Sequence, residues 1–307
     1  MPKEFEAATD AGLPRQRPLA WTLFVSLRPK QWTKNGLLLL GLVFSLSLRE
    51  PDLVVKALLA FVDFCALASA TYLVNDVIDL ERDRQHPIKR RRPIASGQVS
   101  PGVALTMSAL LLAAAMALAA TLDTAFALTA LAYLILTMSY SMWLKHIAII
   151  DVLAVAAGFV LRAAAGAVVV GVPISPWLYV CTLLGALFLA TSKRRHEIVL
   201  LQNYAGEHRR SLDGYNVQFL DQMIAILASA SVIAYCLYTF SAAYVPKNQA
   251  MMLTIPFVLY GIFRYLYLVQ AREGGGTPEE ALLTDWPLLG TVVGWGVVSI
   301  LIIYVFR

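Results

Sequence analysis

The chain has 307 residues, of which 59% are hydrophobic and only 15% are charged. Soluble domains carry roughly 45–50% apolar and about 25% charged residues, and disordered chains combine low hydrophobicity with high charge. The composition therefore excludes both classes and predicts an all-α, polytopic membrane protein. The formal net charge of +5 fits basic loops at the cytosolic face of a membrane better than a nucleic-acid partner.

Nine segments are long and apolar enough, or nearly so, to cross a bilayer, which takes about 20 residues of helix. They cover residues 31–49, 53–75, 101–122, 124–143, 147–171, 176–193, 222–244, 249–270 and 286–306. Of the 25 Lys and Arg residues, 19 lie in the N-terminal tail, in the loops on its side or at the span ends that border them, and 4 lie on the opposite side. This bias predicts a cytosolic N-terminus and a C-terminus outside. We expect a cytosolic tail over 1–30 and one nine-helix transmembrane domain over 31–307.

Three breaks between the spans carry a capping residue followed by proline: Ser100-Pro101, Ser175-Pro176 and Thr277-Pro278. Proline suits the first position of a helix, because the N–H that it lacks has no partner there in any case. Helices are therefore predicted to begin at these three prolines.

Polar residues open the first predicted span, where Lys34 and Asn35 lie just inside the cytosolic boundary. Trp32 in the same segment is typical of the aromatic belt at a membrane interface. Two interpretations of Lys34 stay open. It is either an anchor that extends its ammonium group to the interface, or a contact to a ligand.

An acidic cluster continues from the second span into the cytosol, with Asp76, Asp79 and Asp83 spaced to share one helical face. Asn75 adds a neutral oxygen one residue earlier. Three like charges on one face repel each other and favour a bound cation. Oxygen ligands without His or Cys suit Mg²⁺, which keeps part of its shell for water and substrate phosphates. A solvated charged face is the alternative, but the opposite helix face continues apolar.

Basic residues follow at once: Arg84, Lys89, Arg90, Arg91 and Arg92. An acidic cluster followed by a basic one suits a metal-bound diphosphate, because the carboxylates hold the metal and the cations meet the remaining phosphate oxygens. Arg90 and Arg91 can be explained by membrane topology alone. Lys89 and Arg92, which flank the turn, are the better candidates for ligand contacts.

The fourth and fifth spans add polar residues near the same face. Tyr140 and Lys145 close the fourth span, and Asp151 and Arg162 lie within the fifth. A charge inside the bilayer faces the bundle interior or a cavity. We favour an anion contact for Arg162 over a structural role in which it binds backbone carbonyls. The small residues 163–166 that follow it allow close helix packing.

The end of the sixth span is basic rather than acidic. Lys193, Arg194 and Glu197 share one helix face by their spacing, and Asp213 and Asp221 are the acidic residues further along. Basic residues therefore outnumber acidic ones where the sixth span ends.

The nine spans, the pattern Asn75-Asp76-x-x-Asp79-x-x-x-Asp83 and the following Arg92-Pro93-Ile94-x-x-Gly97 resemble the UbiA superfamily of intramembrane prenyltransferases over nearly the whole chain. Typical members carry a second Asp-rich motif after the sixth span, where this chain has Lys193-Arg194-Arg195-His196-Glu197 and a lone Asp213. With the segments 28–35, 72–77, 86–94, 144–146 and 161–163, this departure is similar to one branch of the superfamily, the decaprenyl-phosphate phosphoribosyltransferases.

The resemblance implies a Mg²⁺-dependent enzyme of the plasma membrane that transfers 5-phosphoribose from phosphoribosyl pyrophosphate to a decaprenyl-type polyprenyl phosphate and releases pyrophosphate. The product would serve arabinan synthesis for the cell wall, and the site would face the cytosol. The oligomeric state stays open, a homo-oligomer included.

The resemblance also implies roles for single residues. The metal ligands would be Asn75, Asp76, Asp79 and Asp83. The leaving group would be neutralised by Lys34, Lys89, Arg92 and Lys145. The 5-phosphate or the lipid phosphate would meet Arg162, Lys193 and Arg194. The ribose hydroxyls would bind Glu197 and Tyr215, and the substrate-binding set would be completed by Asn35 and Tyr140.

Two alternatives stay open at this point. The first is a UbiA-type prenyltransferase that moves a prenyl group from a diphosphate to an aromatic acceptor, and the missing second Asp-rich motif speaks against it. The second is a membrane transporter, which would use charges within the spans along a path. The polar residues cluster on one side of the membrane instead, which fits an enzyme better.

Overall fold

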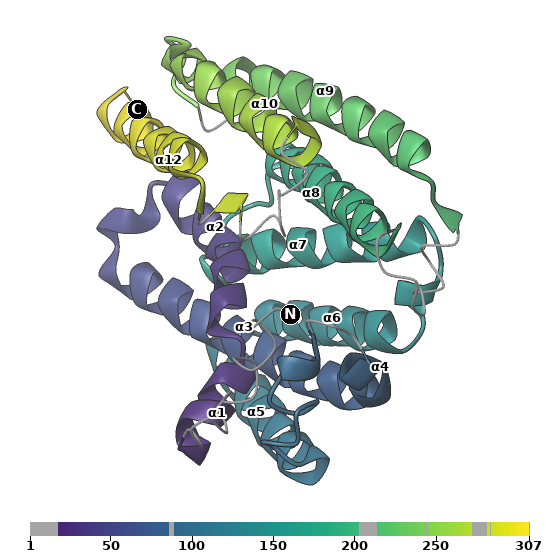
Figure 1. The fold of residues 1–307 in the computed structure, drawn as a ribbon. Helices are drawn as coiled ribbons and strands as arrows, with labels where there is room; N and C mark the ends of the chain where they lie inside the picture. The colour runs from purple at the N-terminus through teal and green to yellow at the C-terminus, as the bar shows by residue number, and fades with distance from the viewer. Residues whose placement is uncertain are drawn as a thin grey trace.

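The protein is an α-helical bundle in which every regular element of the described residues is a helix (Figure 1). The computed structural model describes residues 18–85, 89–202, 214–242, 245–271, 281–282 and 284–306. The long helices are α3 (Pro51–Ile78), α5 (Pro101–Leu122), α6 (Thr124–Met142), α7 (Ile150–Val169), α8 (Pro176–Gln202), α9 (Val217–Ser241), α10 (Ile255–Ala271) and α12 (Trp286–Phe306). The short ones are α1 (Leu19–Ser26), η1 (Pro29–Leu38), α2 (Leu39–Phe44), η2 (Ser47–Arg49), α4 (Leu80–Gln85), η3 (Lys89–Arg91), η4 (Leu144–His146) and η6 (Ala250–Thr254).

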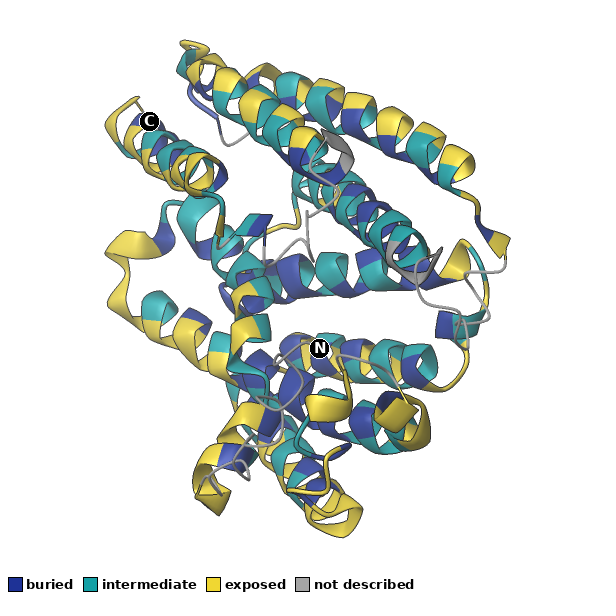
Figure 2. Cartoon of the chain, viewed as in Figure 1, coloured by how far each residue is buried: buried dark blue, intermediate teal, exposed yellow. Residues whose placement is uncertain are grey.

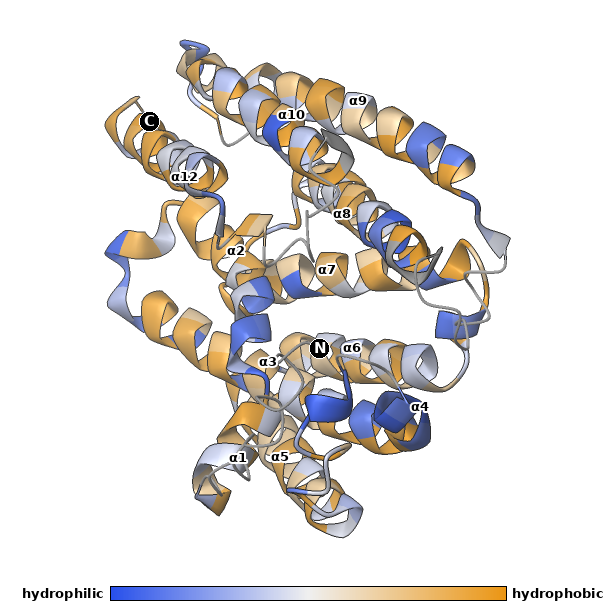
Figure 3. Ribbon diagram, viewed as in Figure 1, coloured by the Kyte–Doolittle hydropathy of each residue, from blue (hydrophilic) through white to orange (hydrophobic). Residues whose placement is uncertain are grey.

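Eight helices among the described residues are long and apolar enough to cross a membrane, the last but one being the continuous run of η6 and α10. Their outward faces carry exposed apolar side chains, and their inward faces are buried (Figure 2). Hydrophilic residues gather at α4, at η3 and at the second half of α8 (Figure 3). The chain is thus a multi-pass membrane protein of the all-α class, as predicted.

The first predicted span, 31–49, is not one of these eight helices, so eight of the nine predicted membrane-length helices are found among the described residues and the count of nine is not confirmed. Residues 29–38 form the 3-10 helix η1, and α2 adds only six residues. This segment packs closely against α7. A Cβ atom on Gly166 would lie 1.9 Å from the Leu38 carbonyl oxygen, and one on Gly41 would lie 2.8 Å from the Ala167 nitrogen. The small residues of α7 do allow the close packing predicted for them.

Two of the three predicted helix starts are confirmed. The Ser100 hydroxyl accepts a hydrogen bond from the Val103 N–H at 3.3 Å, and α5 begins at Pro101. Helix α8 begins at Pro176. The third start, Thr277-Pro278, lies outside the described residues. Helix α1 falls within the predicted tail 1–30, and the boundary of that tail stays a prediction.

The largest buried cluster joins α3, α6 and α7 around Phe64, Phe126 and Tyr133. The Phe64 ring centroid lies 5.8 Å from that of Phe126 and 5.1 Å from that of Tyr133. Aromatic pairs at such distances add to the stabilisation that burial gives. This cluster fixes the arrangement of the three helices that carry several of the polar residues described next.

Candidate functional site

A cavity of 2160 Å³ lies within the bundle. It exceeds the roughly 300–1,000 Å³ of most small-molecule sites. Its wall includes Trp177 near the start of α8 and Lys193 further along the same helix. At 1.5 Å per residue these two positions are about 24 Å apart along the helix axis. The cavity therefore extends from a polar end to an apolar, aromatic end, where Tyr235, Tyr238 and Trp295 line it.

Most of the predicted site residues line this one cavity. They are Lys34, Asn75, Asp79, Asp83, Lys89, Arg92, Tyr140, Lys145, Arg162, Lys193, Arg194 and Glu197. Asn35 and Asp76 are not part of its wall but contact the wall residues Arg162 and Arg92. Tyr215 contacts Asp151, which is also off the wall and is bound by Arg194. The structure thus brings the predicted set together around a common space, and the role of each residue stays a prediction.

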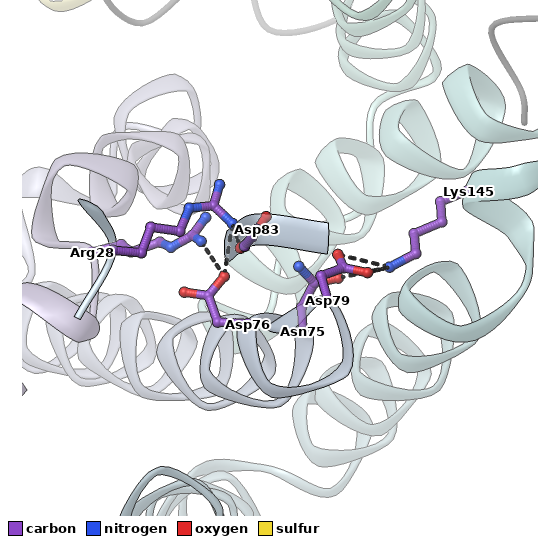
Figure 4. A network of polar contacts seen from close by, with 7 residues as sticks. Arg28, Asn75, Asp76, Asp79, Asp83 and Lys145 are labelled. Atoms are coloured by element: carbon purple, nitrogen blue, oxygen red, sulfur yellow. Dashed lines mark hydrogen bonds and ion pairs between the residues drawn. The ribbon is translucent and has the colours of Figure 1, made fainter. Parts of the chain in front are cut away.

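The acidic motif does not lie on one continuous helix, contrary to expectation. Helix α3 ends at Ile78, Asp79 follows in a turn, and α4 begins at Leu80. The turn keeps the bond from the Asp83 N–H to the Asp79 carbonyl oxygen at 2.8 Å. Because of this break, Asp76 and Asp79 point to different partners (Figure 4).

Two arginines hold Asp76 and Asp83. Arg28 pairs with the Asp76 carboxylate. The Arg92 Nη1 atom donates to Asp76 Oδ1 at 3.0 Å and to Asp83 Oδ2 at 2.6 Å. The Arg28 guanidinium also lies 4.9 Å from the centroid of the Tyr72 ring. The sequence interpretation missed Arg28, and its only local signal is the Pro29 that follows it and starts η1.

Lys145 holds the other half of the motif. Its Nζ atom lies 2.8 and 2.9 Å from the two carboxylate oxygens of Asp79 and 3.3 Å from Asn75 Oδ1. Lys145 comes from η4, directly after α6, and is only 4% exposed. Three oxygen atoms thus surround one buried ammonium group at the wall of the cavity (Figure 4).

Arg162 is tied to the protein at three points and also lines the cavity. Its Nε donates to Asn35 Oδ1 at 2.7 Å, its Nη1 to the Gly158 carbonyl oxygen at 2.9 Å, and its Nη2 to the Tyr133 hydroxyl at 2.6 Å. A guanidinium has five N–H donors, so two are left for a ligand. Arg162 thus binds a backbone carbonyl, as its structural role would require, and also lines the cavity, where it could contact an anion. The anion contact stays a prediction.

A second network lies between α6, α7 and α8. The Arg194 Nε donates to Asp151 Oδ2 at 2.6 Å, its Nη1 to Glu197 Oε2 at 2.6 Å, and its Nη2 to the Tyr140 hydroxyl at 3.0 Å. Asp151 and Arg194 are 0% and 3% exposed. A guanidinium held by two carboxylates at this depth is rigidly placed.

Tyr215 belongs to this second network rather than to the cavity wall. Its hydroxyl donates to Asp151 Oδ1 at 2.7 Å and accepts from the Ile149 N–H at 2.6 Å. Burial, and then the bond to the Asp151 carboxylate, raise the pKa of this hydroxyl, so it stays a neutral donor. In the described structure it therefore holds the start of α7, and direct contact with a ribose is not what its position favours.

The donors at the polar end fit a hard cation such as Mg²⁺. Asn75, Asp79 and Asp83 place oxygen atoms on the cavity wall, and neither His nor Cys stands among these donors. Such a donor set suits Mg²⁺, which also keeps water and phosphate ligands. No group of three His, Cys, Asp or Glu side chains in the described part of the chain is already arranged around a common metal position.

Positive charge dominates the cavity wall. It carries nine Lys or Arg residues, namely Arg28, Lys34, Arg82, Lys89, Arg92, Lys145, Arg162, Lys193 and Arg194, against the three acidic residues Asp79, Asp83 and Glu197. Low-dielectric walls strengthen the field of such a set. The cavity is therefore suited to a ligand with several negative charges.

Comparison with known proteins gives full-length relatives. The chain is 36% identical to a decaprenyl-phosphate phosphoribosyltransferase of Corynebacterium glutamicum, over 95% of this chain and 90% of that protein. It is 35% identical to the protein of the same name from Mycolicibacterium smegmatis, over 94% of each.

The fold of the chain is also similar to those of solved structures of UbiA homologues. The structure of a UbiA homologue from Archaeoglobus fulgidus bound to GPP and Mg²⁺ matches with a TM-score of 0.68 at 20% identity, covering 92% of this chain and 97% of that one. The family profile described as the UbiA prenyltransferase family matches residues 36–284. From its sequence and its fold, the chain belongs to the UbiA prenyltransferase family.

Proposed function

We propose that the protein transfers 5-phosphoribose from phosphoribosyl pyrophosphate to a polyprenyl phosphate of the decaprenyl type. The observation that carries this proposal is the charge of the cavity wall, with nine basic against three acidic residues. Phosphoribosyl pyrophosphate brings a diphosphate and a separate 5-phosphate, and the acceptor brings another phosphate. The relatives of the same length that carry this activity in their name support the choice.

The reaction is a substitution at the anomeric carbon of the ribose. The bond from this carbon to the diphosphate oxygen breaks, a bond to an oxygen of the lipid phosphate forms, and pyrophosphate leaves with the bonding electron pair. The transition state gains oxocarbenium character, as in other glycosyl transfers. The lipid phosphate is already ionised at neutral pH, so the reaction needs no strong general base. Positioning and neutralisation of the leaving group then supply the catalysis.

The residues at the polar end divide these tasks. Asn75, Asp79 and Asp83, whose oxygens face the cavity, would hold Mg²⁺. Bound there, Mg²⁺ would neutralise charge that develops on the departing pyrophosphate. Asp76 is not on the cavity wall, so its task is to hold Arg28 and Arg92.

The basic residues further round the wall take the remaining phosphates. Lys89 and Arg92 follow the acidic motif in sequence, Arg92 and Lys145 contact it, and Lys34 lines the same cavity. We assign these four residues to the leaving group. Lys193 and the remaining donors of Arg162 are assigned to the 5-phosphate or the lipid phosphate. Glu197, whose carboxylate is held by Arg194 at the cavity wall, is the candidate for the ribose hydroxyls.

The apolar end of the cavity suits the lipid. The wall there consists of aromatic and aliphatic side chains over the first turns of α8 and the last turns of α9, and an isoprenoid chain loses apolar surface to water when it binds there. Soluble phosphoribosyl pyrophosphate would enter from the cytosol, the side predicted for all the motifs. Product use in arabinan synthesis at the plasma membrane belongs to the same proposal.

The test compares two reaction mixtures with the purified protein and Mg²⁺. The first contains phosphoribosyl pyrophosphate and a polyprenyl phosphate, and the second contains a prenyl diphosphate and aromatic acids. Release of pyrophosphate is measured in both, with the Asp79→Ala variant as control. Release that requires the lipid phosphate in the first mixture, and is lost in the variant, is the expected result. Release in the second mixture alone would overturn the proposal.

The second candidate is prenyl transfer to an aromatic acceptor, which the shared fold with a GPP-bound homologue favours. It would need a second acidic group after α8. Asp221 is not on the cavity wall and accepts from Arg195 Nε at 2.5 Å, and Asp213 lies outside the described residues. This candidate therefore ranks behind phosphoribosyl transfer. The transporter alternative has no support, because the chain belongs to a family of prenyltransferases.

A further inference from the structure

Each carboxylate of the acidic motif is already paired with a cation of the chain. Asp76 binds Arg28 and Arg92, Asp83 binds Arg92, and Asp79 binds Lys145. Three carboxylates thus face three cations, and their formal charges cancel. A motif that is neutral as a whole attracts a bare divalent cation only weakly, although its oxygen atoms are suitable ligands.

Lys145 is the cation in direct competition with the metal. Its ammonium contacts both carboxylate oxygens of Asp79 and the amide oxygen of Asn75. Two of the three side chains assigned to Mg²⁺ are therefore in contact with one buried ammonium group. A metal that binds these oxygens must displace the ammonium from them.

The displaced ammonium needs an anion to receive it. The cavity wall is strongly basic, so an ammonium released into the empty cavity would meet like charges and lose hydrogen bonds. A diphosphate changes this balance, because its oxygens accept from the released ammonium while they also ligate the metal. The exchange of partners is then favourable only when metal and diphosphate arrive together.

We propose that Lys145 is a specificity-determining residue that excludes the bare divalent cation and admits it only together with a diphosphate. This inference rests on the proposed function, since it takes the cavity to be the site of a metal-bound diphosphate substrate. It goes further in giving the metal-free protein a defined state, in which Lys145 holds Asp79 and Asn75. It also predicts that the two ligands bind with strong positive cooperativity.

The test measures binding of Mn²⁺, as a paramagnetic substitute for Mg²⁺, by electron paramagnetic resonance of the purified protein in detergent. The wild-type protein should bind Mn²⁺ at least tenfold more tightly with phosphoribosyl pyrophosphate than without it. Lys145→Gln removes the competing charge-assisted hydrogen bonds, so Mn²⁺ affinity without diphosphate should rise about tenfold. Lys145→Arg keeps a cation at this position and should retain weak binding of the bare metal.

Lys193→Gln is the matched control, because it removes the same charge from the same cavity wall and Lys193 forms no ion pair with the described carboxylates. Its affinity for Mn²⁺ alone should stay within about twofold of the wild type. Equal Mn²⁺ affinity of the wild type with and without diphosphate would overturn the inference. This comparison uses the wild type alone, so it holds even if Lys145→Gln does not fold. Mn²⁺ uptake that requires geranyl diphosphate and ignores phosphoribosyl pyrophosphate would instead overturn the proposed function and leave the role of Lys145 intact.

Discussion

Two networks of carboxylates and cations lie at the polar end of the bundle, and they differ in what their carboxylates face. In the acidic motif, Asp79 and Asp83 lie on the cavity wall and Lys145 or Arg92 reaches across to them. In the second network, Asp151 is fully buried and its oxygens accept from Arg194, Tyr215 and the Val152 N–H.

From this difference we infer that an ion pair at this end of the molecule has one of two uses. Contacts that border the cavity can be exchanged for contacts to a ligand, because the ligand supplies replacement partners. A carboxylate that is off the cavity wall, as Asp151 is, holds helices in place, because no ligand in the cavity replaces its partners. The four predictions that follow test this distinction in order of decreasing effect.

The largest effect is expected at Asp79, in the network that we assign to exchange. Asp79→Ala should lower the rate of pyrophosphate release by about 10²–10³-fold, since it removes a ligand that neutralises the leaving group through the metal. Thermal stability should fall less than in a variant that removes a fully buried carboxylate, because the Asp79 side chain is 20% exposed at the cavity wall. Glu81→Ala is the matched control, because Glu81 is an exposed residue of the same segment that pairs with Arg84 on the surface. A rate unchanged in Asp79→Ala would contradict the assignment.

The opposite pattern is expected at Asp151, in the network that we assign to structure. Asp151→Ala leaves Arg194 buried with Glu197 as its remaining carboxylate, and it should lower the free energy of unfolding by about 3 kcal/mol. The measurement is the temperature at which the protein in detergent loses its monodisperse peak in size-exclusion chromatography. The double variant Asp151→Leu with Arg194→Met should lose less stability than the single one, because it leaves no buried charge without its partner. If the double variant lost as much stability as the two single variants together, the pairing of Asp151 with Arg194 in one network would be contradicted.

The sequence predicted the long helices well, because length and hydropathy decide whether a segment spans a membrane. The bounds of α5 and α12 agree with the predicted spans 101–122 and 286–306. The segment 31–49 is not found as one membrane-length helix among the described residues, and its hydropathy carried no information on how closely its backbone approaches α7. Gly41 and Gly166 meet the partner backbone at distances that no Cβ atom tolerates, and such a contact appears only when the two helices are placed together.

The candidate site was predictable as a set of residue types and less so as a set of contacts. The spacing of Asn75, Asp79 and Asp83 predicted that they share a site, and all three line the cavity. Asp76 belongs to the same motif but does not lie on the wall, and its carboxylate pairs with Arg28 and Arg92. Arg28 was missed because its partner lies 48 residues away in the chain. Partners so far apart in sequence are fixed by the packing of α3 against the first segment, which no local pattern reports.

A third kind of carboxyl group belongs to neither network. Asp63 in α3 is 1% exposed, and neither of its oxygens has a hydrogen-bond partner in the described structure. An unsatisfied buried polar group costs stability. Asp63→Leu should therefore raise the free energy of unfolding by about 1–3 kcal/mol, seen as a higher transition temperature in the same chromatographic assay. The control is Asp123→Leu, which removes the acceptor for the Phe126 N–H at the start of α6 and should destabilise by about 1 kcal/mol.

The smallest effect is expected at Lys193, which differs from its neighbour Arg194 on α8. Lys193 lines the cavity and forms no ion pair with the described residues, while the adjacent Arg194 is held by two carboxylates. Lys193 is therefore the residue of this pair that can give its whole charge to a phosphate. Lys193→Gln should raise the KM for phosphoribosyl pyrophosphate or for the polyprenyl phosphate about tenfold, or ~1.4 kcal/mol, with kcat changed less.

The control for Lys193 is Arg195→Gln, which removes a neighbouring charge that pairs with Asp221 away from the cavity wall. Both KM values should stay close to those of the wild type in this variant. The substrate whose KM responds to Lys193→Gln identifies which phosphate lies beside α8. If neither KM responds, α8 contributes its charge to stability alone, and the phosphates must lie against the acidic motif and Arg162. Of the two networks, only the one around Lys145 would then be exchangeable, and substrate contact would be confined to the wall formed by α3, α4, η4 and Arg162 of α7.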